Sequence, residues 1–287
     1  MIVSAQIVGG KEVTDAFAGA ILPWWSFGKT VIAAIVFKLA EQGRLDLDTP
    51  LTDKPFTLRQ LLAHRAGVRD YGGVAGYHAA VARGDMAWPV EELLQRAQAD
   101  ELLFTPGQGW SYSNIGYLFV RQEIERATGS ELRAALQDVA FAPLGVHAAM
   151  VRRREDMERV PWPQLHSYDP NWVYHGLILG TAIDAARFLD RLFTTGFLSE
   201  ASRQAMLDSI PLPFAVTGRP FAKPMVATGL MSDPEGPLGP WFGHTGGGPH
   251  SSSAVYRFPS LNRTVAAFAD HEDAGAIERT VLNLAVK

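Results

Sequence analysis

The chain has 287 residues, of which 47% are hydrophobic and 20% charged, and its formal net charge at neutral pH is -4. These values lie close to the averages of globular proteins, so the composition excludes a disordered chain and a coiled coil. The weak negative charge, with no basic run longer than Arg152-Arg153-Arg154, gives no electrostatic footprint for nucleic acid, and the absence of cysteine excludes a thiolate nucleophile.

The N-terminal segment combines β-branched residues with the turn signal Gly9-Gly10, so residues 2–20 predict one short hairpin or a pair of edge strands. The segment lacks the basic start and long apolar stretch of a signal peptide, which leads us to expect a cytoplasmic location. The longest apolar run, residues 31–40, is interrupted by Lys38 and is about half the ~20 residues that span a bilayer. We therefore expect no membrane span.

The next element is a buried helix. The run SFGKTVIAAIVFKLAEQG, residues 26–43, is apolar on nearly every face and ends at Gly43, a residue typical of helix C-terminal caps. Ser26 is expected at or near the N-terminus of this helix.

Helical patterns dominate residues 55–172, in the runs LRQLLAHR, VEELLQRAQ, NIGYLFVRQEIERATG and ELRAALQDVAF. A further amphipathic helix is predicted over residues 181–192. It is followed by the strand-like runs SSSAVYRF and TVAAFA and by a closing helix through residue 284. Large aromatic residues that are candidates to line a hydrophobic cleft are Trp24, Trp25, Trp162, Trp172, Tyr174 and Trp241.

Strands at both ends of the chain with helices between them predict an α+β fold: an antiparallel sheet built from both chain ends, flanked by helices, with an inserted all-helical subdomain. We expect a single domain over residues 1–287. Its sheet part would comprise residues 1–54 and 173–287, and its helical subdomain residues 55–172.

Ser26 and Lys29 are the only Ser-x-x-Lys pair in the chain, and they open the buried helix directly after Pro23-Trp24-Trp25. Residues i and i+3 share a helix face, so the ammonium would lie beside the hydroxyl. The positive potential at a helix N-terminus lowers the pKa of a lysine, and a neutral lysine can accept the serine proton. The alternative is that Ser26 only caps the helix and Lys29 is solvated.

Tyr112-Ser113-Asn114 is the only Tyr-x-Asn in the chain, and it stands just before the helix expected to begin near Ile115. A phenol near a lysine can pass protons between nucleophile and leaving group, and an Asn amide can hold a substrate carbonyl. The alternative makes Asn114 the helix N-cap and Tyr112 a packing residue.

His244-Thr245-Gly246-Gly247 leads into a strand-like run. Glycines there would let a substrate approach the strand closely, and the Gly247 N–H could act as an oxyanion donor. The alternative is a glycine turn in a hairpin.

The ordered set SxxK, YxN and HTG resembles the class C β-lactamase-like branch of the penicillin-recognising serine hydrolases, a family with DD-peptidase, D-aminopeptidase, carboxylesterase and acyltransferase members. The resemblance covers roughly residues 20–270. It extends to the runs SFGKTVIAAIVFKLAEQGRLDLDTPL, LRQLLAHRAGVRDYGG, WSYSNIGYLFVRQEIERATG, FAPLGV and GTAIDAARFL.

The resemblance implies that Ser26 is the acylated nucleophile and that Lys29 and Tyr112 are the acid/base pair. It further implies that Asn114 contacts the substrate amide and that the backbone N–H groups of Ser26 and Gly247 form the oxyanion hole.

The resemblance also places His244 and Thr245 among the substrate-binding residues. His244 stands where β-lactamases usually carry lysine, which argues against an efficient β-lactamase. We expect it to face the cleft with an ordinary pKa near 6.5. Other departures are Phe27-Gly28 within SxxK and a segment before Ser26 that is shorter than is usual in the family.

We therefore expect a serine hydrolase of the carboxylesterase or D-amino-acid peptidase type that cleaves a small-molecule ester, amide or peptide, with weak β-lactamase activity at most. The alternatives are a non-catalytic or acylation-only penicillin-binding-like module and an acyltransferase. No cofactor is expected, since the eight histidines form no HxH or HExxH pattern and no nucleotide-binding glycine motif occurs.

Overall fold

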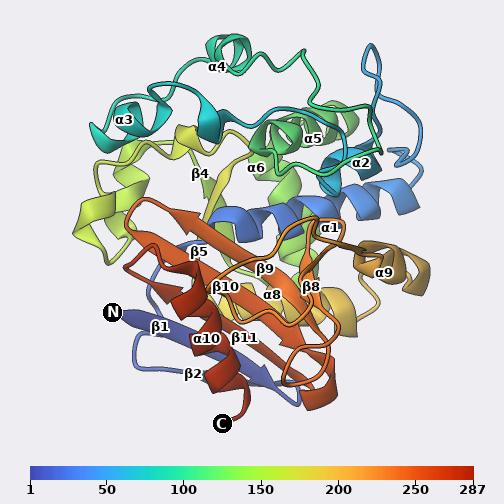
Figure 1. Ribbon diagram of the computed structural model, residues 1–287. Helices are drawn as coiled ribbons and strands as arrows, with labels where there is room; N and C mark the ends of the chain where they lie inside the picture. Colours follow the sequence, from blue (N-terminus) through green and yellow to red (C-terminus); the bar gives the residue numbers. More distant parts are fainter.

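The computed structural model describes residues 1–287 (Figure 1). The strands are β1 (Ile2–Val8), β2 (Lys11–Thr14), β3 (Leu22–Pro23), β4 (Ala148–Val151), β5 (Leu177–Gly180), β6 (Ile210–Pro211), β7 (Met225–Val226), β8 (Met231–Asp233), β9 (Trp241–Gly248), β10 (Ser251–Phe258) and β11 (Arg263–Ala269). The α-helices are α1 (Gly28–Glu41), α2 (Leu58–Leu62), α3 (Tyr77–Ala82), α4 (Val90–Arg96), α5 (Asn114–Thr128), α6 (Leu132–Ala135), α7 (Ala142–Leu144), α8 (Ala182–Thr194), α9 (Glu200–Leu207) and α10 (Ala274–Ala285).

The main sheet joins the two ends of the chain. Its eight strands lie in the order β2-β1-β11-β10-β9-β8-β7-β6, and every neighbouring pair is antiparallel. β1 pairs along its whole length with β11, from Ile2 opposite Ala269 to Val8 opposite Arg263. The N-terminal hairpin and the α+β fold with a sheet from both ends are thus confirmed.

The central strands of this sheet are buried on both faces: side chains alternate between the two faces along a strand, and every residue of β10 is buried. Tyr256 of β10 and Val265 of β11 pack in the smaller hydrophobic cluster with Ile277 of α10. Val255 of β10 and Phe268 of β11 point to the opposite face of the sheet and belong to the main cluster. Helix α8 contacts β10 and β11 on that face. Helices therefore cover the sheet in front and behind, as Figure 1 shows.

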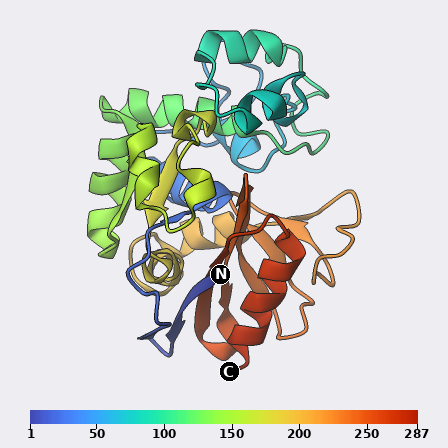
Figure 2. The same ribbon diagram turned by 90° about the vertical axis from the view of Figure 1, so that its left-hand side faces the viewer.

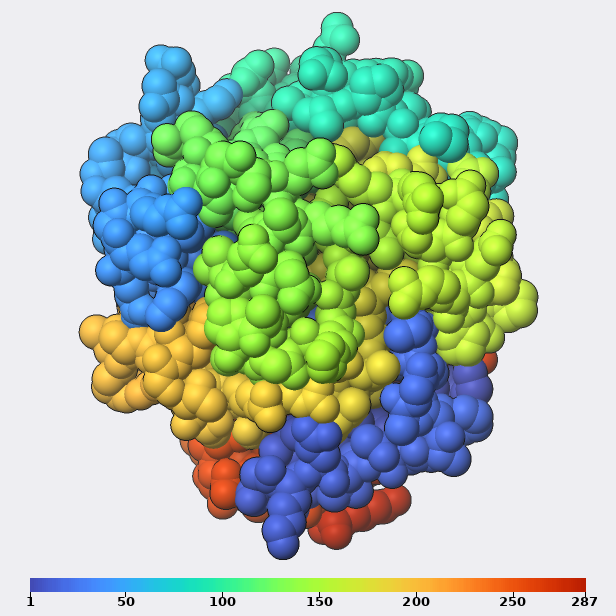
Figure 3. Space-filling view, turned by 180° about the vertical axis from the view of Figure 1, so that it is seen from behind, coloured from blue at the N-terminus to red at the C-terminus, as the bar shows by residue number.

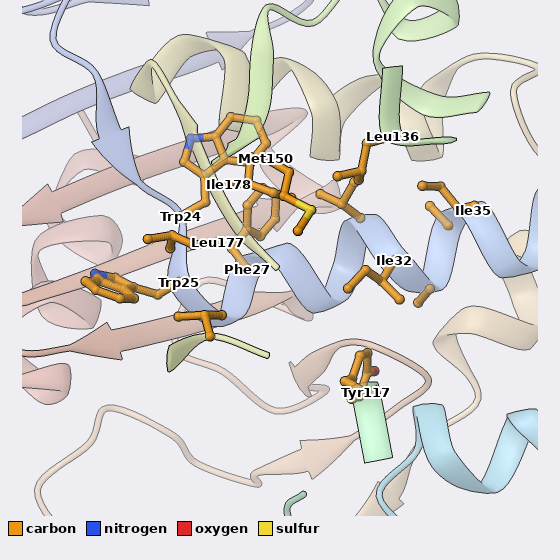
Figure 4. Packing of buried hydrophobic residues seen from close by; sticks show 14 of the residues in the cluster. Trp24, Trp25, Phe27, Ile32, Ile35, Tyr117, Leu136, Met150, Leu177 and Ile178 are labelled. Atoms are coloured by element: carbon orange, nitrogen blue, oxygen red, sulfur yellow. The ribbon is translucent and has the colours of Figure 1, made fainter. Parts of the chain in front are cut away.

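α1 lies in the centre of the main core, where all of its residues from Gly28 to Phe37 are buried. Figure 4 shows apolar side chains from several other segments around it, among them Tyr117, Leu136 and Met150. The predicted helix end is confirmed, since Gly43 adopts a φ of +69° just past the C-cap residue Gln42. Of the aromatic residues expected in a cleft, Trp24, Trp162, Trp172 and Trp241 lie instead in the cores with at most 2% exposure.

A small three-stranded sheet, β3-β5-β4, holds the chain directly before α1. Leu22 and Pro23 of β3 pair with β5, and β4 pairs with β5 on the other side. β3 has only two residues, too few for an alternating pattern to be recognised in the sequence. Its pairing with β5 nevertheless fixes the position of the turn that carries Ser26.

Within residues 55–172 the regular elements are helical apart from β4. Viewed from the side, α3, α4 and α5 lie above the main sheet (Figure 2). From behind, the green residues that follow α5 cover the middle of the molecule, with the dark blue N-terminal residues below them (Figure 3). No helix has both the length and the apolar character needed to cross a membrane.

Candidate functional site

Ser26 lies near the N-terminus of α1, as expected. It belongs to a 3₁₀ turn, Trp25–Phe27, that precedes α1, and its side chain does not cap the helix. Trp25 has a φ of +43°, a left-handed conformation that is strained for a bulky residue. The flanking contacts hold it: Trp24 N–H donates to the Ile178 carbonyl of β5 at 2.9 Å, and Trp25 Nε1 donates to Ser251 Oγ of β10 at 2.9 Å.

Lys29 is fully buried, and its Nζ atom has three partners. It lies 3.1 Å from Ser26 Oγ, 2.7 Å from Asn114 Oδ1 and 3.2 Å from His175 Nε2. The expectation that the amine lies beside the hydroxyl therefore matches the geometry, whereas the alternative of a solvated Lys29 is wrong. His175 was not singled out from the sequence because it belongs to no spacing pattern and is 146 residues from Lys29.

Burial lowers the pKa of Lys29 to about 7, with the Asp70 carboxylate opposing the shift. Desolvation favours the uncharged form of an amine. A large fraction of Lys29 is then neutral near pH 7 and able to accept a proton from Ser26.

Tyr112 OH lies 2.8 Å from Ser26 Oγ. Burial raises the pKa of the Tyr112 phenol well above its ordinary value, so the group stays protonated and can donate. The ring of His64 stacks on Tyr112 with 4.3 Å between centroids, and His64 Nδ1 accepts the Ser113 N–H at 3.1 Å. The alternative of Tyr112 as packing only does not account for the contact with the serine hydroxyl.

α5 begins at Asn114, and Ser113, not Asn114, is its N-cap. Ser113 Oγ accepts the Gly116 N–H at 2.9 Å and donates to the Arg69 carbonyl at 3.0 Å. The Asn114 N–H donates to Asp70 Oδ1 at 2.7 Å, which leaves the Asn114 side chain free to contact Lys29.

The HTG segment lies within strand β9 and pairs with β10, so the alternative of a glycine turn is wrong. A Cβ atom on Gly246 would lie 2.8 Å from the backbone nitrogen of Ser26 and 2.7 Å from Ser253 Oγ. A Cβ on Gly247 would have no atom within 4 Å. Glycine at 246 therefore allows the strand to approach the serine, while Gly247 faces open space.

Thr245 belongs to a buried polar network. Its hydroxyl contacts the carboxylate of Glu278, a residue of α10 with no exposed surface, and accepts from Arg219 at 3.0 Å. Glu278 also accepts from Arg219 Nε at 2.9 Å and from Tyr256 OH at 3.0 Å. α10 thus anchors the strand that carries the HTG residues. Sequence reasoning missed this network, since its members share no motif.

His244 corrects one expectation. It is 5% exposed, its Nδ1 lies 2.6 Å from the Thr245 carbonyl, and burial together with the charge of Lys29 lowers its pKa to about 3. The expectation of an ordinary pKa near 6.5 is therefore wrong, and the imidazole is neutral between pH 5.5 and 8.

A cavity of about 560 Å³ opens over Ser26, and we call it the catalytic cavity. Tyr112, Asn114, His175 and Gly247 line it with Ser26, and Tyr71, Tyr77, Tyr168 and Trp25 supply aromatic walls. A volume of this size suits a small organic molecule. Among all 287 residues no group of three His, Asp or Glu side chains is placed to hold a metal ion.

The Beta-lactamase family model matches residues 3–285. The chain belongs to the Beta-lactamase family. Penicillin-binding protein 4* of Bacillus subtilis is 26% identical over 91% of this chain and 63% of its own length, and esterase EstB of Burkholderia gladioli is 30% identical over 42% of this chain and 36% of its own length. The chain thus spans less than two thirds of the length of these curated relatives.

Solved structures share the fold of this Beta-lactamase family member. A D-stereospecific amidohydrolase from Streptomyces sp. superposes with a TM-score of 0.82 at 22% identity, over 98% of this chain and 92% of the other. The D-amino acid amidase of Ochrobactrum anthropi superposes with a TM-score of 0.80 at 21% identity, over 99% and 91% of the two chains. The expected fold and family are confirmed.

Proposed function

We propose that the protein hydrolyses a small ester or amide through an acyl-enzyme on Ser26. The observation that carries this proposal is that two groups contact one oxygen: Ser26 Oγ lies 3.1 Å from the amine of Lys29 and 2.8 Å from the phenol of Tyr112. A nucleophile beside a base that is poised near neutral pH is the arrangement that covalent catalysis requires.

In acylation, Ser26 Oγ forms a bond to the carbonyl carbon while its proton passes to the neutral amine of Lys29. The backbone N–H groups of Ser26 and Gly247 are the oxyanion donors in this scheme. The bond to the leaving group then breaks, and the leaving atom takes the Tyr112 proton, which the Lys29 ammonium replaces. In deacylation a water attacks the acyl carbon, and the same groups carry its proton back to Ser26.

Asn114 would hold the acyl side of the substrate with its amide N–H, while its carbonyl oxygen keeps Lys29 in place at 2.7 Å. The names of the relatives support the class of bond, since they include an esterase, a D-stereospecific amidohydrolase and a D-amino acid amidase. We propose residues 1–287 as one catalytic domain.

We expect the protein to have at most weak β-lactamase activity, because of the charges near His244. The carboxylate of a β-lactam needs a free cation, but His244 is neutral and Arg219 is paired with Glu278. Both features favour neutral substrates.

Turnover of a chromogenic ester tests the proposal. We expect sustained hydrolysis by the parent and none by Ser26→Ala. A burst that stops at one equivalent would identify an acylation-only protein, and transfer of the acyl group to an added alcohol faster than to water would identify an acyltransferase.

A further inference from the structure

A second cavity, of about 320 Å³, adjoins the catalytic cavity, and we call it the apolar cavity. Tyr112, Gly247 and Glu272 line both cavities, whereas Ser26 and Asn114 line the catalytic cavity alone. Most of the apolar lining comes from residues 212–231, with Leu212, Phe214, Val216, Met225, Val226 and Leu230 among them.

The apolar cavity holds no unpaired cation. Its one basic residue with a permanent charge, Arg219, is ion-paired with the fully buried Glu278, and His244 is neutral. The remaining charge, Glu272, is exposed and its carboxylate accepts the His250 N–H at 2.8 Å. An anionic group would meet apolar walls and a like charge here, so an uncharged apolar group fits best.

The acyl group and the leaving group can be assigned to different cavities. The acyl carbon becomes bonded to Ser26 Oγ, so the acyl group stays in the catalytic cavity beside Asn114. The leaving atom must lie next to the Tyr112 hydroxyl that protonates it, and Tyr112 stands where the two cavities meet. Trp110 and Phe214, whose rings are 5.6 Å apart, form an aromatic wall beyond it.

We propose that the apolar cavity binds the leaving group of the substrate and selects an uncharged, apolar alcohol or amine. This inference rests on the proposed function and adds its substrate class. Leaving-group contacts affect acylation alone, because every ester of one acid gives the same acyl-enzyme.

The test is a series of acetate esters with alcohols from methyl to hexyl. We expect kcat/KM to rise about fourfold for each added methylene until the cavity is filled, as burial of apolar surface predicts. Butyl acetate should exceed the acetate ester of 4-hydroxybutyrate, which carries a carboxylate, by about tenfold or more. A flat alcohol profile, or a preference for the carboxylate, would overturn the inference.

A matched pair of variants locates the effect. Leu212→Asn should lower kcat/KM for hexyl acetate about tenfold and for methyl acetate less than twofold. Leu103→Asn, a control at an exposed leucine outside both cavities, should change neither. An equal loss for both esters in Leu212→Asn would contradict the assignment. Absence of Ser26 acylation by any ester would instead refute the proposed function.

His175 supports a second inference from a separate observation. A neutral lysine amine has two N–H bonds and one lone pair. Asn114 Oδ1 at 2.7 Å and His175 Nε2 at 3.2 Å can accept the two N–H groups, which leaves the lone pair for the hydroxyl of Ser26. We infer that His175 is a positioning residue that orients the lone pair of Lys29 toward Ser26.

The surroundings of His175 agree with this role. The side chain is 2% exposed, and burial lowers its pKa well below the ordinary value, so the ring is neutral and one nitrogen can accept. Nε2 accepts when the ring proton is on Nδ1, and since Nδ1 has no hydrogen-bond partner in the protein, no other contact fixes the tautomer.

A variant that keeps a hydrogen-bond acceptor at residue 175 distinguishes a positioning role of His175 from a packing role. His175→Leu should lower kcat/KM for methyl acetate about 10-fold to 100-fold, whereas His175→Gln, whose amide oxygen can accept, should stay within about fivefold of the parent. His166→Leu removes a hydrogen bond to the Val160 carbonyl outside the cavity and is the control. His175→Phe replaces His175→Leu if the latter does not fold.

Equal activity losses in His175→Gln and His175→Leu, at equal Tm, would show that His175 only packs. Full activity in His175→Leu or His175→Phe would show that Lys29 needs no third partner. Either result overturns the inference.

Discussion

The amine of Lys29 and the hydroxyl of Ser26 lie 3.1 Å apart, and the lysine has no exposed surface. This relationship joins folding to chemistry, because the same burial that places Lys29 within the core also lowers its pKa to about 7. A lysine on the surface at the same spacing would remain charged and could not accept the serine proton.

The pH dependence of acylation follows from Lys29. Its neutral form is the base, and the neutral fraction rises with pH, so the acylation rate should increase about tenfold per pH unit below pH 6 and level off above pH 8. Stopped-flow measurement of acylation between pH 5 and 9 tests this. A rate that falls as the pH rises over this range would exclude Lys29 as the base.

Tyr112→Phe should lower the acylation rate by about 10²-fold or more, since it removes the hydroxyl that lies 2.8 Å from Ser26 Oγ. Because burial raises the pKa of the phenol well above its ordinary value, we further expect no second increase in the parent's rate between pH 8 and 10 from ionisation of this tyrosine. Activity in Tyr112→Phe equal to that of the parent would reduce Tyr112 to a packing role.

The two glycines of strand β9 make a matched pair. Gly246→Ala places a methyl group 2.8 Å from the Ser26 nitrogen and should lower the free energy of unfolding by about 1–3 kcal/mol. Gly247→Ala meets no atom within 4 Å and should change that free energy by less than about 0.5 kcal/mol. Urea unfolding of both variants checks the difference, and equal losses would contradict the close approach at residue 246.

Glu278→Gln should lower the free energy of unfolding by about 3 kcal/mol, because it leaves the Arg219 guanidinium without its buried partner. Glu235→Gln is the control: it breaks an exposed pair with Lys223 and should leave the free energy of unfolding almost unchanged. If the two variants unfold at the same denaturant concentration, the network does not anchor β9.

His244 should leave substrate choice independent of pH. Since its pKa is lowered to about 3, the ratio of penicillin acylation to neutral-ester acylation should stay constant between pH 5.5 and 8. Titration of Lys29 alters both rates equally and cancels in the ratio. If this ratio instead rose as the pH fell through 6.5, His244 would be charged and would face the substrate carboxylate, contrary to this account.

Motif order was enough to predict the partners Ser26, Lys29 and Tyr112, because each stands in a short local pattern at the boundary of an element. The sheet from both chain ends followed from the placement of strand-like runs. The 3₁₀ turn around Ser26 could not be predicted, since it depends on the pairing of β3 with β5, more than 150 residues later.

Long-range contacts explain the other differences. His175 and the Glu278–Arg219 pair have no local signature, and the fold alone brings them to Lys29 and Thr245. The pKa of His244 depends on burial beneath neighbouring segments, which a sequence pattern does not report.

The central claim is that Ser26 is the nucleophile, and intact-mass measurement after exposure to a fluorophosphonate tests it most directly. The parent should gain a single adduct that peptide mapping places on Ser26, and Ser26→Ala should gain none while keeping its fold, because the lost hydroxyl leaves only a small gap. An adduct of the same mass on another residue of Ser26→Ala would contradict the claim.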